Sequence, residues 1–358
     1  MPESLIEVLP DIVSEGKKEV ERIMDRLESP YKLGLQTNEL VIPSKDIAGL
    51  LRGQVKDDIK SEWYNRLIYG DNLLVMQALL AGDEESGLPS MRGKIDLIYI
   101  DPPFDSKADY RTKITLPSGD IEQKPSIIEQ FAYSDTWKYG TVSYLKMLYP
   151  RLVLMRELLS EQGSIYVHLD WHVGHYVKIL LDDIFGKDNL VNEIIWSYRT
   201  GGVPEKGFAK KHDVIYYYKK SEKYYFNTLK EKTFIPTLAN RTFAKEKLGA
   251  EIDNEGCPVC GLKGQWYKMS IMRDVWDITP LFRNSQERVN YFTQKPSEIL
   301  ERIINASCPK DGIAADFFGG SGTTAAVAEK LGRRWIMSDI NETACKITKE
   351  RLEKLTLK

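Results

Sequence analysis

The tetrapeptide Asp101-Pro102-Pro103-Phe104 places a carboxylate, two rigid prolines and an aromatic ring directly after the apolar run Ile95–Ile100. The carboxylate could accept hydrogen bonds from the exocyclic amino group of a flat base, and the ring could stack on that base. Two successive prolines donate no ladder hydrogen bonds, so a strand over 95–100 must end there. A plain turn would explain the prolines equally well, so this tetrapeptide alone does not decide the function.

A second segment that could form part of a binding site, residues 316–324, reads DFFGGSGTT. Residues 320–325, which begin within it, match G-x-G-x-x-A, and Asp339 ends the next expected strand. Glycines let the backbone approach a ligand closely, and the acidic residue accepts hydrogen bonds from ribose hydroxyls, so the pattern fits an adenosine-containing cofactor. The late position of this loop argues against a nicotinamide dehydrogenase, and its lack of lysine argues against a nucleoside triphosphate loop.

Together these segments resemble the amino-group DNA methyltransferases. The order of the segments is the tetrapeptide, a variable basic stretch, Asn290-Tyr291-Phe292-Thr293-Gln294-Lys295-Pro296 and then the glycine loop. This order is similar to that of the permuted β-class, including modification subunits of type III restriction systems, and the resemblance extends from 66 to 355. It implies an α/β, Rossmann-like, S-adenosylmethionine-dependent fold with a mainly parallel sheet, helices on both faces, a circular permutation and an inserted target-recognition region.

The resemblance also implies which residues hold the cofactor, S-adenosylmethionine. Phe318, Gly320 and Gly322 would approach its methionine part, and Asp339 would bind its ribose. Asp71 would lie near the adenine, although a plain helix cap is an equal alternative for this residue. Lys295 could equally be a surface residue. The complete predicted set is Asp71, Thr293, Gln294, Lys295, Asp316, Phe318, Gly319, Gly320, Ser321, Gly322, Thr323 and Asp339.

By the same resemblance, Asp101, Pro102, Pro103 and Phe104 are catalytic. The exocyclic amino nitrogen of adenine is a poor nucleophile because its lone pair is delocalised into the ring. Hydrogen bonds to the Asp101 carboxylate and the Pro102 carbonyl would favour a pyramidal nitrogen that attacks the sulfonium methyl group. The target base must leave the duplex stack to reach this site, where Phe104 would stack on it.

Aspartate at the first position favours adenine, because cytosine-modifying relatives more often have serine there. Two alternatives stay open at this point. One is a cytosine 4-amino methyltransferase, and the other is a DNA-binding modification subunit without catalysis.

The stretch 199–250 contains 12 lysines and arginines against 5 acidic residues, whereas the whole chain has a net charge of −2. Aromatic residues are frequent in the same stretch, and basic charge with aromatic rings suits a nucleic-acid face. A strand with its aromatic face in the core and solvated lysines opposite is the alternative, and we expect both to contribute. The candidate DNA contacts are Arg199, Lys206, Lys210 and Lys211.

No metal is predicted, because the expected leaving group is a neutral thioether. His168, Asp170 and His172 at a strand end are interpreted as structural or substrate-shaping rather than as ligands. Cys257 and Cys260 have the spacing of half a zinc site, but the chain contains no second cysteine pair. Unpaired thiols are the favoured interpretation, and zinc binding stays open.

The composition is that of a globular protein: 358 residues, 42% of them hydrophobic, can form a large α/β domain with an insertion. No apolar run approaches the roughly 20 residues of a membrane span, and the acidic N-terminus lacks a signal-peptide pattern. We expect a cytoplasmic protein that binds double-stranded DNA and no membrane. The family resemblance implies a homodimer and allows a restriction subunit as a further partner.

Alternating hydrophobic patterns predict the elements that position these residues, among them strands over 164–169 and 313–318. An amphipathic helix over 4–27 could pack on the main domain or on a second subunit, and 105–140 is predicted to be a long loop. Both motifs then fall at carboxyl ends of strands, where ligands bind in such folds. The predicted domains are an N-terminal helical extension (1–45), a catalytic half (46–219), a target-recognition insertion (220–290) and a cofactor-binding half (291–358).

Overall fold

Two compact units form the chain: a main unit, Met1–Tyr225 with Val275–Lys358, and a second unit, Phe226–Asp274. The computed structural model describes residues 4–28, 63, 65–82, 89–103, 140–198, 204–236, 241–282, 284–289, 291 and 293–356. For 40–42, 112–116 and 119–123 it describes the backbone alone.

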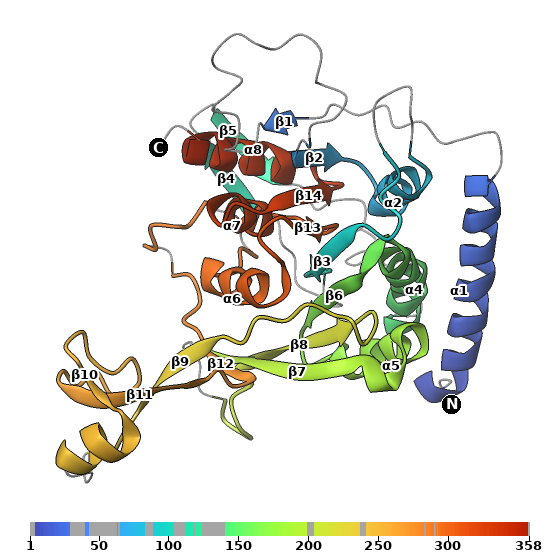
Figure 1. Cartoon of the computed structure of the whole chain (residues 1–358). Coiled ribbons are helices and arrows are strands. Elements are labelled where there is room, and N and C mark those ends of the chain that lie inside the picture. The colour runs from blue at the N-terminus through green and yellow to red at the C-terminus, as the bar shows by residue number, and fades with distance from the viewer. Residues whose placement is uncertain are drawn as a thin grey trace. The chain divides into compact units, whose positions relative to one another are not determined.

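The main unit is built on a mixed sheet in which most neighbouring strands are parallel (Figure 1). The strands β2, β14, β13, β3 and β6 run parallel to one another. β8 is antiparallel to both β6 and β7, so β7 again points in the direction of β6. Among the described residues the sheet has nine strands, in the order β1 (Leu40–Ile42), β2 (Asn65–Tyr69), β14 (Arg334–Asp339), β13 (Ile313–Asp316), β3 (Ile95–Ile100), β6 (Leu159–Leu169), β8 (His212–Lys219), β7 (Leu190–Ser197) and β12 (Val275–Asp277).

Helices cover both faces of this sheet (Figure 1). Side chains alternate between the faces, as in β3, where Ile98 enters one core and Leu97 the other. The first core is closed by α1 (Leu5–Glu28), α2 (Asn72–Ala81), α4 (Thr141–Leu158) and α5 (Gly174–Phe185), and the second by α6 (Ser297–Ser307), α7 (Thr323–Lys330) and α8 (Glu342–Thr356). The predicted α/β fold with helices on both faces is confirmed. None of the helices described is long and apolar enough to cross a membrane.

Most predicted elements agree with the structure to within about two residues at each end, which is the usual uncertainty of element boundaries. β13 ends at Asp316, before the predicted 318, because the Asp316 carboxylate accepts a hydrogen bond from the Phe318 backbone at 2.9 Å and turns the chain. β6 begins at Leu159, well before the predicted start at Ser164. β8 is buried on both faces, so its tyrosines 216–218 belong to the core.

The prediction of a long loop over 105–140 is wrong in part. β4 (Thr112–Leu116) and β5 (Gly119–Gln123) form an antiparallel hairpin, with Thr112 opposite Gln123. These strands alternate threonine, lysine and acidic residues with single isoleucines, so their period-2 pattern is weak in sequence.

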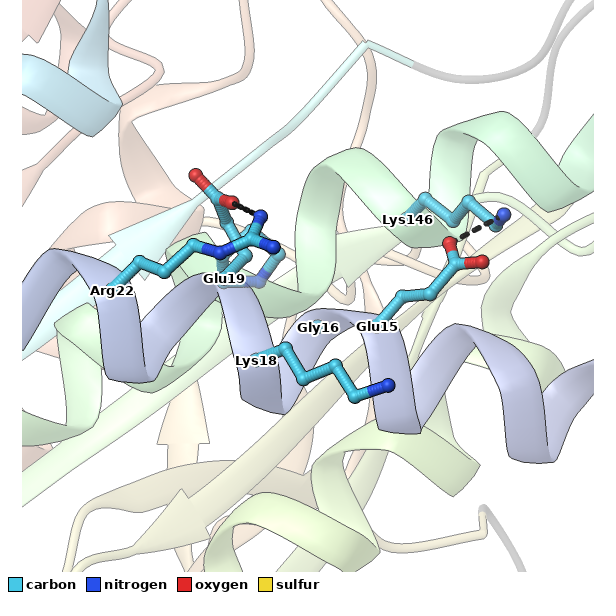
Figure 2. A pocket seen from close by; sticks show the side chains of 7 residues that line it. Glu15, Gly16, Lys18, Glu19, Arg22 and Lys146 are labelled. Carbon is cyan, nitrogen blue, oxygen red and sulfur yellow. Dashed lines mark ion pairs between the residues drawn. The ribbon is translucent and has the colours of Figure 1, made fainter.

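α1 packs against α4 of the same chain. Of the two possibilities left by the sequence, the main domain and a second subunit, the structure shows the main domain. Gly16 lies so close to the Tyr149 ring that a β-carbon there would collide with it. Glu15 forms an ion pair with Lys146 of α4 at 2.6 Å. Figure 2 shows this ion pair beside a shallow surface pocket lined by charged side chains of the two helices, and none of the predicted site residues lines it.

The second unit, Phe226–Asp274, contains a three-stranded antiparallel sheet in the order β10 (Glu251–Asp253), β11 (Gln265–Ile271) and β9 (Lys230–Phe234). It lies within the predicted insertion, 220–290. Residues 275–290 return to the main unit, where β12 pairs with β7. The role of this unit in target recognition stays a prediction.

Candidate active site at the carboxyl edge of the sheet

Four acidic residues stand at the carboxyl ends of four neighbouring parallel strands. Asp71 follows β2, Asp339 ends β14, Asp316 ends β13 and Asp101 follows β3. Because neighbouring parallel strands end at the same edge of a sheet, these carboxylates line one edge of the main unit. The structure thus brings together the two segments that the sequence analysis singled out.

Asp101 forms an ion pair with Lys295, a residue far away in sequence. The two side chains are only 16% and 13% exposed, so this pair is largely shielded from water. The Lys295 backbone carbonyl in turn accepts a hydrogen bond from the Thr323 hydroxyl at the start of α7, at 3.4 Å. The Lys295 side chain is therefore largely buried against Asp101 and does not lie on the surface. Pro102 is buried and Pro103 partly buried, whereas Phe104 lies outside the described residues.

The glycine loop between β13 and α7 depends on its glycines for space and for backbone conformation. Gly320 and Gly322 have positive φ angles, 51° and 74°, which favour glycine. A β-carbon on Gly322 would lie 2.6 Å from Thr348, and one on Gly319 would collide with Met337. Two of the predicted cofactor glycines are thus required by packing alone.

Asp339 holds the glycine loop in place. One of its carboxylate oxygens accepts a hydrogen bond from the Gly320 backbone at 2.7 Å, and the other accepts one from the Asn341 backbone at 2.7 Å. Both carboxylate oxygens of Asp339 are thus acceptors that hold the backbone on either side of the strand end. The Ser321 hydroxyl lies 3.1 Å from that of Thr323, beside Gly322 at the start of α7.

Asp316 is buried directly beneath the loop, with 2% of its surface exposed. It accepts hydrogen bonds from the Phe318 backbone at 2.9 Å and from the Thr324 hydroxyl at 2.5 Å. Burial raises the pKa of Asp316 to about 7, with repulsion from Asp101 and Asp339 adding to the rise and the two hydrogen bonds opposing it. These three carboxylates therefore lie close enough to feel one another's charge.

Asp71 is both a helix cap and a partner of a buried arginine. Its carboxylate accepts the Leu73 backbone N–H at 2.8 Å, which caps α2. The Arg151 guanidinium of α4 lies 3.2 Å from the same carboxylate and also donates to Asn72 at 2.6 Å. Arg151 was missed by the sequence analysis; its signal would have been a basic residue within the apolar run of a core helix.

The segment before α6 is held by its own glutamine. The Gln294 side chain accepts a hydrogen bond from the Val289 backbone at 2.8 Å and donates one to the Glu287 carbonyl at 2.8 Å. Thr293 is exposed, and Phe318 is half-buried against the first core. Of the three predicted residues 293–295, only Lys295 has a side chain that contacts another predicted site residue.

A buried polar chain that the sequence analysis did not predict runs behind the ion pair. The Tyr99 hydroxyl lies 2.8 Å from His168 Nδ1, and His168 Nε2 lies 3.3 Å from Asp213, which also accepts from Tyr198. Burial acts to raise the pKa of Asp213, but the hydrogen bond and charge of His168, together with the charge of Lys295, lower it overall. The sequence signal for this buried chain was Asp213, an acidic residue that directly precedes the apolar run of β8.

The remaining candidates have structural contacts. Asp170 accepts the backbone N–H groups of His172 and Val173 at 3.0 and 3.3 Å and so caps a turn. The Cys260 backbone donates to the Cys257 sulfur at 3.4 Å within a tight turn. In the described part of the chain, no three cysteine, histidine or acidic side chains gather closely enough to hold a metal ion.

The predicted DNA contacts lie in the segment that joins β7 to β8. Lys206 and Lys210 are exposed and Lys211 is partly buried, whereas Arg199 lies outside the described residues. The Lys210 ammonium lies 3.4 Å from the centroid of the Trp171 ring, which follows β6 at the same edge.

A family model described as DNA methylase, of the N6 and N4 amino-methyltransferase type, matches residues 95–350. This chain belongs to that DNA methylase family. The chain is 30% identical over 166 residues to the type III restriction-modification enzyme EcoP15I Mod subunit of Escherichia coli, covering 43% of this chain and 24% of that protein. It therefore spans about a quarter of the length of this relative.

The chain is also 26% identical to the DNA adenine methyltransferase YhdJ of Escherichia coli K12, over 77% of this chain and 83% of the relative. Among solved structures, the cytosine-N4-specific PvuII DNA methyltransferase matches 82% of this chain and 90% of its own, with 17% identity and a TM-score of 0.49.

S-adenosylmethionine, the methyl donor of this family, carries a positive charge on sulfur, and the residues at the edge fit such a group. The mutual repulsion of Asp101, Asp316 and Asp339 would be relieved by a bound cation. The glycine loop next to them exposes no side chain at Gly320 that would obstruct a ligand. The predicted cofactor is therefore consistent with the charge and the backbone of this site.

Proposed function

We propose that this methylase transfers a methyl group from S-adenosylmethionine to the exocyclic 6-amino group of a flipped-out adenine in double-stranded DNA, at specific sites. One observation carries this proposal. The Asp101 carboxylate stands at the end of β3, beside the strand that leads into the glycine loop, and is held there by Lys295. A fixed carboxylate next to a cofactor loop is what activation of an amino nitrogen requires.

Asp101 acts as an oriented hydrogen-bond acceptor. Its Oδ2 atom accepts a hydrogen bond from Lys295, and Oδ1, which has no hydrogen-bond partner in the described part of the chain, would accept an N–H of the target amino group. A carboxylate can only accept hydrogen bonds, so it suits an amino group that donates two. The Pro102 carbonyl accepts the second N–H, so the nitrogen lone pair is freed from the base ring.

When bound, S-adenosylmethionine would supply the methyl group, with its sulfur keeping the electron pair of the broken bond as a neutral thioether. The amino nitrogen would form the new N–C bond and then lose one proton to water. Asp101 need not be a strong base, because the proton leaves after the transfer. Phe104 would stack on the flipped base.

Asp71, Asp316, Asp339 and the loop residues 318–323 form the proposed cofactor site, closed by 293–295. Asp339, which ends β14 beside the glycine loop, is proposed to bind ribose hydroxyls, and Asp316 to stabilise the cationic end. The acidic edge of the sheet supports both assignments, because it offers acceptors and negative charge where a cationic nucleoside would lie.

We further propose the permuted β-class arrangement, in which 46–219 carries catalysis, 220–290 recognises the target and 291–358 binds the cofactor. The order of the elements supports this, since the glycine-loop strand β13 lies centrally in the sheet yet comes late in the chain. A homodimer and a restriction subunit as partner are also proposed, from the similarity to type III modification subunits. Mass measurement in solution tests the homodimer, with twice 41.1 kDa expected.

The experiment that tests the function is nucleoside analysis of DNA incubated with the enzyme and S-adenosylmethionine. N6-methyladenine is the expected product. Detection of N4-methylcytosine instead would show that the target base is cytosine, and the proposed mechanism would still apply. DNA without any modified base would contradict the proposed activity. Sequencing with modified-base detection on the same sample identifies the recognition site.

A further inference from the structure

Phe208 is the most exposed large apolar side chain of the described residues, with 100% of its surface open to solvent. It lies in the segment 204–211, the loop that precedes β8. This loop also contains three lysines and one glutamate. An aromatic ring that contacts nothing contributes no burial to the fold, so folding does not explain its presence there.

The loop is rooted beside the proposed active site. β7 runs in the direction of β3 and β6, so its carboxyl end, from which the loop departs, lies at the edge that carries Asp101. At the other end of the loop, Asp213 contacts His168 at 3.3 Å and lies within the electrostatic reach of Lys295, the partner of Asp101. In Figure 1 this segment belongs to the loop between β7 and β8.

Lys210 fixes the loop to the sheet edge, because its ammonium lies over the Trp171 ring, 3.4 Å from the centroid. Two residues earlier, the ring of Phe208 projects into solvent. Lys206 on the other side is exposed as well. Duplex DNA has stacked bases with apolar faces between two rows of phosphates. An exposed ring between two cations, at the edge of the proposed active site, could contact both: the ring would suit the bases and the lysines the phosphates.

We propose that Phe208 enters the DNA duplex and occupies the space in the base stack that the flipped target base vacates, while Lys206 and Lys210 contact the adjacent phosphates. This inference rests on the proposed function. Extruding a base leaves its neighbours unstacked, and apolar side chains, phenylalanine among them, are known to insert between base steps. Filling the vacated space with a ring recovers stacking and holds the duplex open while the base is in the site.

The test is single-turnover methylation of two duplexes that carry the site identified by modified-base sequencing. In one duplex the target base is normally paired, and in the other it faces an abasic position, so that it is already released from pairing. We expect Phe208→Ala to slow methylation of the paired duplex by roughly tenfold or more, because the flipped state loses its stacking partner. The duplex with the abasic position should restore the rate to within about twofold of the wild type.

Three further variants make the result specific. Phe208→Trp keeps a large ring and should retain the wild-type rate. Ile179→Ala removes an apolar side chain that is 47% exposed on α5 and should change neither rate. Lys206→Ala should weaken binding of both duplexes alike, because phosphate contacts do not depend on pairing. The melting temperature of Phe208→Ala should equal that of the wild type, since the ring packs against nothing.

An unchanged rate of Phe208→Ala on the paired duplex would overturn the inference while leaving the proposed function intact. Equal slowing on both duplexes would also overturn it, since that result places Phe208 in another contact, such as one with a second protein. A wild-type enzyme that methylates neither duplex would instead contradict the proposed function, and this inference with it.

Discussion

At the scale of single residues, the site is a set of carboxylates whose neighbours determine their properties. Asp101 is ion-paired with Lys295, Asp71 with Arg151, and Asp339 is engaged by backbone N–H groups. Asp316 is the most buried of the four, and this burial raises its pKa to about 7. Different surroundings thus give four similar side chains different roles.

Replacing Asp101 by Asn tests the acceptor role at constant shape. The amide oxygen can still accept from Lys295, but the other end of the side chain becomes a donor and repels the target N–H. We expect kcat to fall by about 10²–10³, as for loss of one preorganised polar contact in an active site. Cofactor binding, measured by calorimetry, should remain. Asp188→Asn, an exposed position before β7, serves as control, and normal methylation by Asp101→Asn would refute the mechanism.

Asp316 should make the stability of the free enzyme depend on pH. Its folded-state pKa, about 7, lies above the unfolded value of roughly 3.9, so the folded state binds the proton more tightly. The stabilisation is complete below about pH 4 and is lost as pH rises to about 7. Asp316→Asn should therefore show a smaller loss of melting temperature between pH 5 and pH 8 than the wild type. Parallel curves for the two proteins would contradict the assignment.

At the scale of elements, close contacts rather than propensities determine where the helices lie. Glycine in a helix interior is unfavourable by about 1 kcal/mol relative to alanine, yet α1 has Gly16 where it meets α4. The Tyr149 ring fills the space that a β-carbon would need, and its hydroxyl is fixed by a 2.8 Å hydrogen bond to Asp183 of α5. Tyr149 therefore has little freedom to move away.

Gly16→Ala should destabilise the protein, although alanine is the better helix former. The added methyl group forces the helices apart, and such overpacking typically costs about 1–3 kcal/mol. Urea unfolding measures this difference. Ser14→Ala, an exposed position on the same helix, should be neutral or slightly stabilising. A Gly16→Ala variant as stable as Ser14→Ala would show that α1 is held loosely on α4.

At the scale of the whole molecule, charge is distributed unevenly although the net charge is only −2. Acidic groups line the strand ends of the proposed cofactor site, whereas the loop before β8 is basic. Under the proposed function, a cationic cofactor and an anionic duplex would each bind at a surface of opposite charge.

DNA binding should accordingly weaken steeply with salt. The slope of log K against log salt concentration changes by about 0.9 for each phosphate contact, so Lys206→Ala and Lys210→Ala should each reduce it by about one. Lys187, exposed at the opposite end of β7, provides a matched control whose removal should leave the slope unchanged. A wild-type slope near zero would remove this loop from the DNA interface.

Much of the fold could be predicted from sequence, because hydrophobic periodicity is a local property. The run Ile95–Ile100 is recognisable as a buried strand, and two prolines fix its end. The β4–β5 hairpin and the strands of the second unit were not predicted, since their polar alternation differs little from that of a loop.

The α/β elements, the position of both motifs at strand ends and the family resemblance could all be inferred from the amino-acid sequence, because they depend on short-range patterns. The pairing of Lys295 with Asp101, that of Arg151 with Asp71 and the contact of His168 with Asp213 became visible only in the folded molecule. These contacts join residues from different elements, and the strand order that brings them together is set by burying apolar faces on both sides of one sheet. No local pattern encodes which polar partners meet once that sheet has formed.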